Sequence, residues 1–402
     1  HLEQEGLPVA SGPLEVPALA PGSAATVDLP TLPPTTAESW LTVRAVLATD
    51  HPWAPAGHEV AWGQLPVTPT HPVPRAPSTH PAPAPPEPRG THPVPGRVPR
   101  WGSVAQAGEE AGPVVHRPRG PLDSRGPLHV ELGSGSFDAA TGRLVRIGDL
   151  PVDGPLLDLW RAPTDNDRGH HGEAVEPLWR RVGLDRLQHR VDEVAVGDGA
   201  LVVRARVAPA GTDLGVVATY RWSAVPGGLR LELGVVPEGD WPCPLPRVGL
   251  RMAVPAGLRR VEWFGRGPGE AYADTGRAAR VGRFVATVEE LQTPYLYPQE
   301  NGNRAGVRWA TLTDGDGNGI RAEGEPTFDL TARPWTSEQL DAARHPTDLH
   351  PGDRVWVNLD LAQQGIGSAS CGPGVLPAYR LDPAPASLTV RLYPAPAAPS
   401  RR

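Results

Sequence analysis

Residues 201–236 read LVVRARVAPAGTDLGVVATYRWSAVPGGLRLELGVV. Three runs within this stretch, LVVRARV, VVATYRW and LRLELGVV, are rich in apolar residues at alternating positions and are separated by Gly, Pro and Asp. A period of two is typical of strands with one buried face, and Gly, Pro and Asp favour the turns between them. The stretch therefore predicts consecutive antiparallel strands joined by turns.

The same pattern extends from about Leu128 to Pro396, with VRWATLTD, RVWVNLDL and SLTVRLY as further examples. Two short segments, TVEELQ and TSEQLDAAR, favour helix, and Ser337 or Thr336 is available as the N-cap of the second. The chain lacks the alternation of strands and helices that builds a parallel barrel or a nucleotide-binding sheet. We therefore predict an all-β fold, a large antiparallel β-sandwich of about 270 residues.

Composition excludes several classes of partner. The chain has 402 residues and a net charge of -7, and its 38 basic residues, all arginines, form no cluster that would follow a phosphate backbone. The two cysteines, Cys243 and Cys371, form no Cys-x-x-Cys pair, which argues against a disulfide framework and a structural zinc site. Because neither a membrane helix nor a signal peptide is indicated, we expect a soluble, cytoplasmic protein without nucleic-acid or membrane partners.

The chain is predicted to contain more than one domain. Strand-like pieces in residues 1–67, such as AATVDLP and WLTVRAVLA, are too few for a complete sandwich and indicate the C-terminal half of one. The chain begins at His1 and its single methionine is Met252, so we expect part of a longer chain or a processed one. The predicted organisation is a half-sandwich at 1–67, a linker at 68–127, the large sandwich at 128–396 and a tail at 397–402.

The linker is predicted from a proline-dense segment that repeats Thr-His-Pro-x-Pro. Such a segment forms no strand ladder and favours an extended, polyproline-like conformation. The histidines of the repeat have no second type of metal ligand beside them, so a plain linker is favoured over a metal site. These histidines are His71, His80 and His92.

The stretch DGDGNGIRAEGE, from Asp314 to Glu325, matches the ligand spacing of a calcium-binding EF-hand loop. An EF-hand also requires a helix on each side, whereas VRWATLT and PTFDLTA on either side of this stretch are strand-like. A tract of Gly, Asp and Asn between two strands is what a β-hairpin turn requires. The turn is therefore favoured over a calcium site.

Residues 160–169, WRAPTDNDRG, place Asp165 and Asp167 two positions apart between a proline and a glycine. Two carboxylates about 5 Å apart are needed for retaining hydrolysis of a glycosidic bond. Side chains at i and i+2 on a loop, however, usually bind local backbone N–H groups. A structural turn is favoured, with a ligand contact at the edge of a site as the alternative.

The segment TPYLYPQENGNR, from Thr293 to Arg304, combines aromatic, amide and charged side chains. Such a combination is typical of a polar interface, and it is also typical of a sugar site, where rings stack on the sugar and polar groups bind hydroxyls. The interface is the more frequent of the two. Glu300 in this segment has no partner carboxylate that the sequence identifies.

Four motifs together resemble the C-terminal part of the large β-galactosidases of glycoside hydrolase family 2. They are LWRAPTDNDRG (159–169), VEWFGRGPGEAYADT (261–275), TPYLYPQENGNR (293–304) and GIGSASCGPGVLPAYRL (365–381). They follow the order of the family, and residues 39–67 resemble the end of its immunoglobulin-like domain. The resemblance implies a galactose-mutarotase-like super-sandwich after part of an immunoglobulin-like sandwich.

The same resemblance implies a division of labour with segments outside this chain. In the family, the two catalytic glutamates lie on an upstream barrel, so this chain alone is expected to be inactive and to contain no catalytic residue and no metal ligand. Magnesium and sodium are expected only for the complete enzyme, and no cofactor is expected here. The expected partners are a β-galactoside, the barrel-containing part or large subunit, and further copies in a homo-oligomer. The alternatives are a separate non-catalytic small subunit and a carbohydrate-binding module or epimerase.

The resemblance also implies which residues lie near the substrate. Cys371 stands where the family often has a tryptophan that stacks on the sugar, and a mobile loop follows the Thr-Asp-Asn-Asp motif. The residues implied at the pocket edge are Asp165, Asn166, Asp167, Gly169, His170, His171 and Cys371, and those implied in structure or interface are Arg161, Tyr295, Gln299, Glu300, Asn301 and Arg304.

Overall fold

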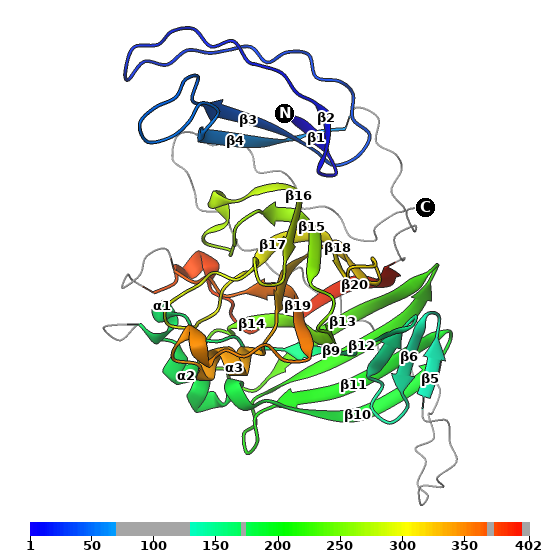
Figure 1. The fold of residues 1–402 in the computed structure, drawn as a ribbon. Helices are drawn as coiled ribbons and strands as arrows, with labels where there is room; N and C mark the ends of the chain where they lie inside the picture. Colours follow the sequence, from blue (N-terminus) through cyan, green and yellow to red (C-terminus); the bar gives the residue numbers. More distant parts are fainter. Residues whose placement is uncertain (70–128, 170–173, 368–373, 396–402) are drawn as a thin grey trace, which may run out of the picture. The chain divides into compact units, whose positions relative to one another are not determined.

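The computed structural model describes residues 1–69, 129–169, 174–367 and 374–395 (Figure 1). The chain divides into two compact units. Unit 1 comprises His1–Val94 and Arg280–Arg283, and unit 2 comprises the remaining residues. The predicted tail and nearly all of the predicted linker lie outside the described residues, and the predicted domain boundaries stay a prediction.

In its described part, unit 1 is a four-stranded antiparallel sheet of order β2-β1-β3-β4. The strand predicted in WLTVRAVLA is confirmed, whereas the one predicted in AATVDLP is wrong. Residues 24–30 form no strand, because they are largely exposed, are followed by prolines and have no strand beside them to complete a ladder. The strands are β1 (Leu2–Gln4), β2 (Leu7–Ala10), β3 (Ser39–Val46) and β4 (Glu59–Val67).

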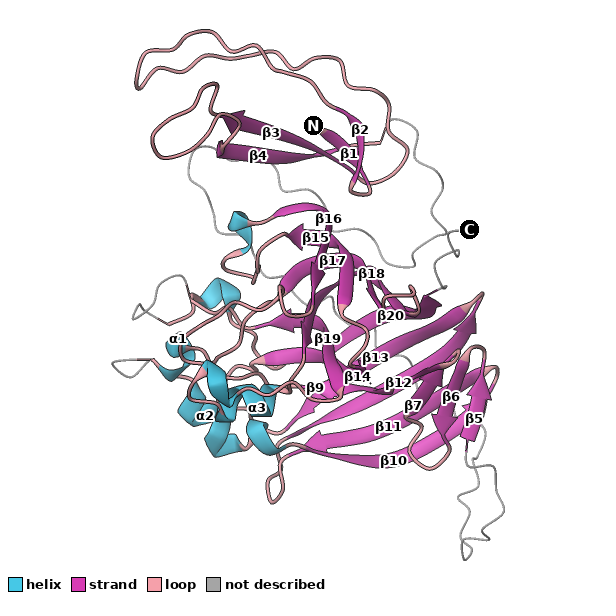
Figure 2. Cartoon of the chain, viewed as in Figure 1, coloured by secondary structure: helices cyan, strands magenta, loops and turns pink. Residues whose placement is uncertain are grey.

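A twelve-stranded sheet lies in the described residues of unit 2, apart from the first four residues of β16, which belong to unit 1. Its strands from β10 to β14 pair antiparallel with their neighbours. The all-β antiparallel prediction is thereby confirmed (Figure 2). The strands are β9 (Asp153–Asp158), β10 (Gln188–Gly197), β11 (Ala200–Ala208), β12 (Gly215–Val225), β13 (Gly228–Glu238), β14 (Arg247–Pro255), β15 (Arg260–Gly267), β16 (Arg280–Thr287), β17 (Arg304–Thr313), β18 (Gly319–Arg333), β19 (Arg354–Gln363) and β20 (Ala386–Ala395).

The large sheet divides at β18, the longest of these strands. Its first part, Gly319–Gly324, pairs with β20 and continues the order β10-β11-β12-β13-β20-β18-β17-β15-β16. Its last part, Asp329–Arg333, pairs with β19, which leads through β14 to β9. The sheet therefore has two branches that share β18. One branch continues through β20 and β17, and the other consists of β19, β14 and β9.

A smaller four-stranded sheet covers part of the larger one. Its strands follow the order β5-β6-β7-β8, and Phe137 on β6 makes an edge-to-face contact with Trp222 on β12, with 5.1 Å between the ring centroids. Both rings are buried, as are the alternating apolar residues of β12 and β13. Apolar alternation thus places the core between the layers. The strands are β5 (His129–Leu132), β6 (Gly135–Asp138), β7 (Leu144–Ile147) and β8 (Leu150–Pro151).

Three short α-helices in the described residues gather at one end of unit 2 (Figures 1 and 2). They are α1 (Asp165–Arg168), α2 (Glu176–Val182) and α3 (Ser337–Ala342). The predicted helix in TSEQLDAAR is confirmed as α3, with Thr336 as its N-cap. The helix predicted in TVEELQ is wrong, because residues 288–291 form only a turn after β16. Pro294 follows closely and disfavours helical geometry in the residue before it.

Candidate functional site

The stretch WRAPTDNDRG folds into one turn of helix, α1, at the end of unit 2. Thr164 caps it, because its hydroxyl accepts a hydrogen bond from the Asp167 N–H at 3.2 Å. The Asp167 carboxylate accepts in return from the Thr164 N–H at 2.9 Å, which completes a capping box. Gly169 ends the helix at a φ of 58°, a conformation that favours glycine. Local capping therefore accounts for the turn that the sequence predicts.

Asp167 is a structural carboxylate in this arrangement. Both its oxygens accept hydrogen bonds from one terminal nitrogen of Arg161 at 2.9 Å, and both side chains are fully buried. The Arg161 guanidinium also lies over the Trp179 ring, 5.6 Å from its centroid. A buried carboxylate that is paired with arginine and used in a helix cap has little capacity left to bind a ligand.

Asp165 differs from Asp167, because its side chain remains 59% exposed. Its N–H donates to Gln299 Oε1 at 2.9 Å, and Gln299 Nε2 donates back to the Asp165 carboxylate at 3.1 Å. Beside it, Arg168 lies over the Tyr297 ring at 4.6 Å. The contacts join α1 to the TPYLYPQENGNR segment and leave one carboxylate facing outward.

A third motif meets α1 at residues 364–367. Asn166 Nδ2 donates to the Ile366 carbonyl at 2.8 Å, and Arg161 donates to the carbonyls of Gln364 and Gly365. The partners of α1 are therefore about 130 and 200 positions away in the chain. Three motifs that the sequence singles out separately form one cluster in the structure.

Glu300 lies beneath this cluster and is buried. Arg333 donates to Glu300 Oε1, which also accepts from the Tyr272 hydroxyl at 3.2 Å and from Arg247 at 3.4 Å. Burial alone would raise the pKa of Glu300, but Arg333, Arg247 and Arg161 outweigh it and lower the pKa below its ordinary value. Glu300 is thus an anionic anchor for the segment that contacts α1, and its charged partners are arginines.

Arg247 connects Glu300 to the sheet below. Its guanidinium lies 3.0 Å from Asp360 on β19 and 3.6 Å from Asp158 on β9. Gly249 is on β14, the strand between β9 and β19, and it pairs with Asp158 on one side and with Asp360 on the other. A Cβ at Gly249 would come within 2.1 Å of Asp360 Oδ1. Burial raises the pKa of Asp360 well above its ordinary value, and the neighbouring carboxylates raise it further against the opposing effect of Arg247.

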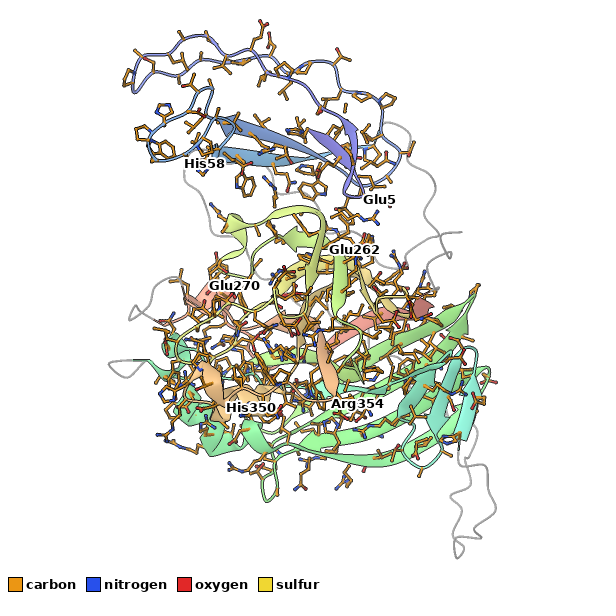
Figure 3. All side chains as sticks on the ribbon, viewed as in Figure 1. Glu5, His58, Glu262, Glu270, His350 and Arg354 are labelled. Carbon is orange, nitrogen blue, oxygen red and sulfur yellow. The ribbon has the colours of Figure 1, made fainter. Side chains whose placement is uncertain are left out.

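Glu270, which is labelled in Figure 3, orders the same segment. Its carboxylate accepts hydrogen bonds from the Thr293 hydroxyl at 2.8 Å, the Tyr295 hydroxyl at 2.9 Å and the Gly302 N–H at 2.8 Å. Burial, followed by Glu270 itself, raises the pKa of Tyr295 to about 12. Tyr295 is therefore a neutral hydrogen-bond donor that helps to order the segment.

The structure thus brings together most of the residues that the sequence predicts for the site. Gln299, Glu300, Asn301 and Arg304 are buried. His170, His171 and Cys371 lie outside the described residues, and the assignment of a pocket edge stays a prediction. Sequence reasoning missed several contributors to this network, and the motif VEWFGRGPGEAYADT was the available signal for Glu270 and Tyr272. The others are Asp158, Arg247, Arg333 and Asp360.

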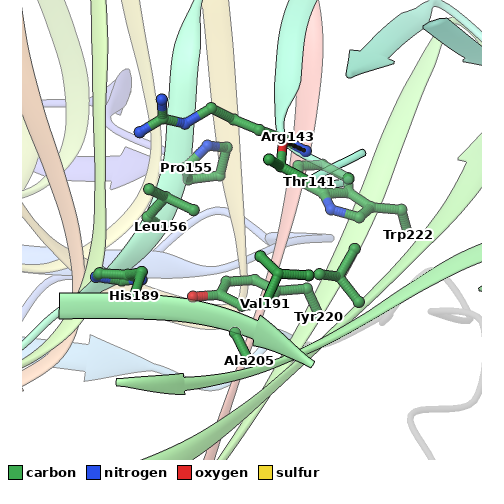
Figure 4. A pocket seen from close by; sticks show the side chains of 11 residues that line it. Thr141, Arg143, Pro155, Leu156, His189, Val191, Ala205, Tyr220 and Trp222 are labelled. Carbon is green, nitrogen blue, oxygen red and sulfur yellow. Dashed lines mark hydrogen bonds between the residues drawn. The ribbon is translucent and has the colours of Figure 1, made fainter. Parts of the chain in front are cut away.

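A pocket elsewhere in unit 2 does not compete with this cluster. It lies between the turn that follows β6 and the strands β9 to β12, and is lined by Arg143, His189, Tyr220 and Trp222 among others (Figure 4). Its volume of about 20 Å³ is enough for one water and too small for a sugar ring. No predicted site residue lines it.

No group of three or more His, Cys, Asp or Glu side chains among the described residues is arranged to hold a metal ion. The DGDGNG stretch is the hairpin turn between β17 and β18, in which Asp314 accepts from the N–H groups of Asp316 and Asn318 at 2.9 Å each. In the described part of the chain, no helix is long and apolar enough to span a membrane.

Fold and cluster together define an antiparallel β-sandwich protein with a rigid polar cluster at the helical end of its larger unit. The family model of the β-galactosidase small chain matches residues 133–392, and that of β-galactosidase domain 4 matches residues 1–68. The chain therefore belongs to the β-galactosidase small chain family, and the predicted resemblance is confirmed.

Individual relatives agree with the family models. A β-galactosidase of Arthrobacter sp. (strain B7) is 34% identical over 95% of this chain and 35% of its own length. A β-galactosidase of Vibrio cholerae is 30% identical over 91% of this chain and 32% of its own length. The chain thus spans about a third of these relatives.

Solved structures to which the chain is similar include a galactose mutarotase-like protein of Lactobacillus casei. It is 14% identical, covers 65% of this chain and 92% of its own, and has a TM-score of 0.35. A putative aldose 1-epimerase of Escherichia coli is 12% identical, covers 66% of this chain and 97% of its own, and has a TM-score of 0.33.

Proposed function

We propose that this chain is the C-terminal part of a β-galactosidase that hydrolyses terminal β-D-galactose residues with retention of configuration. In this proposal, the α1 cluster forms one wall of a substrate pocket whose catalytic carboxylates lie on segments outside the chain. The observation that carries the proposal is the convergence of α1, residues 293–304 and residues 364–367 on one rigid, largely buried network.

The chemistry of the cluster favours a supporting role over a catalytic one. A retaining glycosidase needs one carboxylate as nucleophile and one as acid/base, about 5 Å apart. Here Glu300, Asp158 and Asp360 surround a single arginine, Arg247, and Asp167 is paired with Arg161. Glu300, Asp158 and Asp167 are paired with buried arginines, and carboxylates held in this way are poorly suited to attack a sugar or to protonate a leaving group.

The surface beside α1 supports a contact with another part of the complete protein. Leu296 is 88% exposed and Tyr297 is 42% exposed, and both lie in the segment that contacts α1. Apolar side chains exposed next to polar ones are typical of surfaces that another segment covers. We propose that the barrel-containing part of the enzyme covers them, and that oligomer contacts and the magnesium and sodium sites belong to the complete enzyme.

The test compares the complete protein that contains this chain with residues 1–402 alone. With o-nitrophenyl β-D-galactopyranoside as substrate, the complete protein is expected to be active, and residues 1–402 inactive. Turnover by residues 1–402 at a comparable rate would overturn the division of labour. Restored activity on mixing with a separately expressed upstream part would favour a small subunit, and galactose binding by residues 1–402 in calorimetry would favour a binding module.

A substitution tests the role of Asp165 in the complete enzyme. Asp165→Asn removes the charge and keeps an acceptor for Gln299 Nε2. A residue at the pocket edge predicts a modest change in kcat/KM, whereas a catalytic carboxylate predicts a loss of several orders of magnitude in kcat. Asp382→Asn serves as the control, because the Asp382 side chain is 67% exposed and lies beside Arg380.

A further inference from the structure

The turn at residues 364–367 is fixed unusually completely. Gln364 N–H donates to the Pro246 carbonyl at 3.1 Å, and Gly365 N–H donates to the Tyr379 carbonyl at 2.9 Å. The carbonyls of residues 364 and 365 accept from Arg161, and that of Ile366 accepts from Asn166. A short loop segment with this many partners is rigid, because moving it would break several buried hydrogen bonds together.

Asp274 binds the other side of the same turn. Its two carboxylate oxygens accept from consecutive backbone N–H groups, that of Ile366 at 3.2 Å and that of Gly367 at 2.7 Å. A carboxylate that accepts two adjacent N–H groups fixes both their direction and their distance. Asp274 therefore opposes Arg161 and Asn166 across the turn.

The two glycines of the turn match these side chains. A Cβ on Gly365 would come within 2.5 Å of Asp274 Oδ2, and a Cβ on Gly367 would come within 2.4 Å of Asn166 Nδ2. Gly367 also has a φ of +82°, which other residues adopt at a cost. The glycines thus allow Asp274 and Asn166 to approach the backbone of the turn closely.

The segment that carries Asp274 is itself anchored to the buried network. Ala271 N–H donates to the Asn303 carbonyl at 2.8 Å, and the Tyr272 hydroxyl donates to Glu300 at 3.2 Å. Asp274 follows two residues later in the chain. Glu300 is therefore linked to the turn by its hydrogen bond with Tyr272, the short backbone from Tyr272 to Asp274, and the hydrogen bonds of the Asp274 carboxylate, and the turn is hydrogen-bonded to α1.

We propose that Asp274 is a positioning residue for substrate binding, which acts by holding the 364–367 turn and, through it, α1 against the pocket. The proposal rests on the proposed function, since it takes the α1 cluster as a wall of a galactoside pocket. Asp274 touches the turn and not the substrate. Its loss is therefore expected to weaken binding of substrate and transition state alike, which raises KM and leaves kcat nearly unchanged.

The experiment is Asp274→Asn in the complete enzyme, assayed with o-nitrophenyl β-D-galactopyranoside. Asparagine keeps one acceptor and turns an NH₂ group toward the second N–H. We expect KM to rise about tenfold, which is the effect of losing about one hydrogen bond to a charged group. We expect kcat to stay within about twofold of the parent value. Gly367→Ala disturbs the turn at its contact with Asn166, and it is also expected to raise KM and to leave kcat nearly unchanged.

Asp348→Asn is the matched control. Asp348 also accepts two consecutive backbone N–H groups, those of Arg344 and His345, at 3.0 Å each, in the same unit. Asp348→Asn therefore shows how the loss of such a carboxylate changes stability when the turn at residues 364–367 is left intact. A purely structural role for Asp274 predicts that both variants lower the melting temperature and that neither changes KM.

The outcomes separate the two proposals. If the parent enzyme does not hydrolyse the galactoside, the proposed function fails. If the parent is active but a folded Asp274→Asn or Gly367→Ala variant keeps the parent KM, the proposed function stands and the role of Asp274 is overturned. A KM that rises in both turn variants and not in Asp348→Asn supports the inference.

Discussion

Replacing Asp167 by asparagine tests whether the first motif is primarily structural. Asp167 is fully buried, accepts from Arg161 at 2.9 Å through both oxygens, and caps α1 by accepting from Thr164 N–H at 2.9 Å. Asparagine has nearly the same shape, but it carries no charge and turns an NH₂ group toward one of these donors. Arg161 is then left buried without its counterion.

Breaking a buried pair by removing one partner costs about 3–5 kcal/mol, because an uncompensated charge remains. For a unit of this size, such a loss lowers the melting temperature by roughly 6–10 °C. The measurement is thermal unfolding of residues 1–402, followed by near-ultraviolet circular dichroism. The aromatic signal sums over the twelve tryptophans of the chain and includes Trp179, which is buried beneath the Arg161 guanidinium.

Asp165→Asn is the matched control, two residues away in the same helical turn. The Asp165 side chain is 59% exposed, and its ion pair with Arg168, at 3.6 Å, is an exposed one. We expect a change below about 1 kcal/mol, as is usual for surface ion pairs. Equal shifts for the two variants would refute the assignment of Asp167 as the structural carboxylate and Asp165 as the outward-facing one.

Two further predictions concern the sheet beneath the cluster. Gly249→Ala places a Cβ 2.1 Å from Asp360 Oδ1 and 2.6 Å from its Cα, so we expect urea unfolding to show a loss of about 2–3 kcal/mol. Gly234→Ala on β13 has open space around its Cβ and should be neutral or stabilising, and equal losses would contradict the packing. Burial raises the pKa of Asp329 to about 6, so the folded state binds this proton more tightly than the unfolded state does. The stability that protonated Asp329 contributes to the folded state is therefore present at low pH and is lost as the pH rises through about 6. An asparagine at this position cannot lose a proton, so the difference in the free energy of unfolding between Asp329→Asn and the parent should be about 2 kcal/mol more favourable to the variant at pH 7.5 than at pH 4.5. If the difference in the free energy of unfolding between Asp329→Asn and the parent did not change with pH, the raised pKa of Asp329 would be contradicted.

Strands were predictable because their signal is local. On β12, Val216, Ala218, Tyr220 and Trp222 point into the core and the residues between them do not, as the alternation predicts. The capping residue of α3 was predictable for the same reason. The helix predicted at TVEELQ failed although Glu290 does bind the Thr287 N–H, because the segment ends after a single turn. A start signal alone does not make a helix.

The buried network was not predictable, because its spacing exists only in the folded sheet. Arg247, Asp158 and Asp360 lie on three different strands, and the register alone places them around one guanidinium. Nothing in the sequence near Glu300 indicates that Arg247 and Arg333 are its partners. A signal did exist at Asp274 and Glu270, which belong to the GRGPGEAYADT motif, but their hydrogen-bonding partners are more than twenty residues away.

Asp165 and Asp167 show how a buried structural carboxylate and an exposed one are combined in one short motif. Asp167 points inward, where Arg161 and the cap of α1 use most of its hydrogen-bonding capacity. Asp165 points outward, and its backbone is held by Gln299 from a distant loop. A side chain that must meet a ligand in one geometry needs a backbone that does not move, and hydrogen bonds from distant loops supply that rigidity. The buried arginines and carboxylates therefore hold the backbone that carries the exposed surface of α1. By the same reasoning, we expect a small change at Asp274, which binds the turn beside α1, to alter substrate binding.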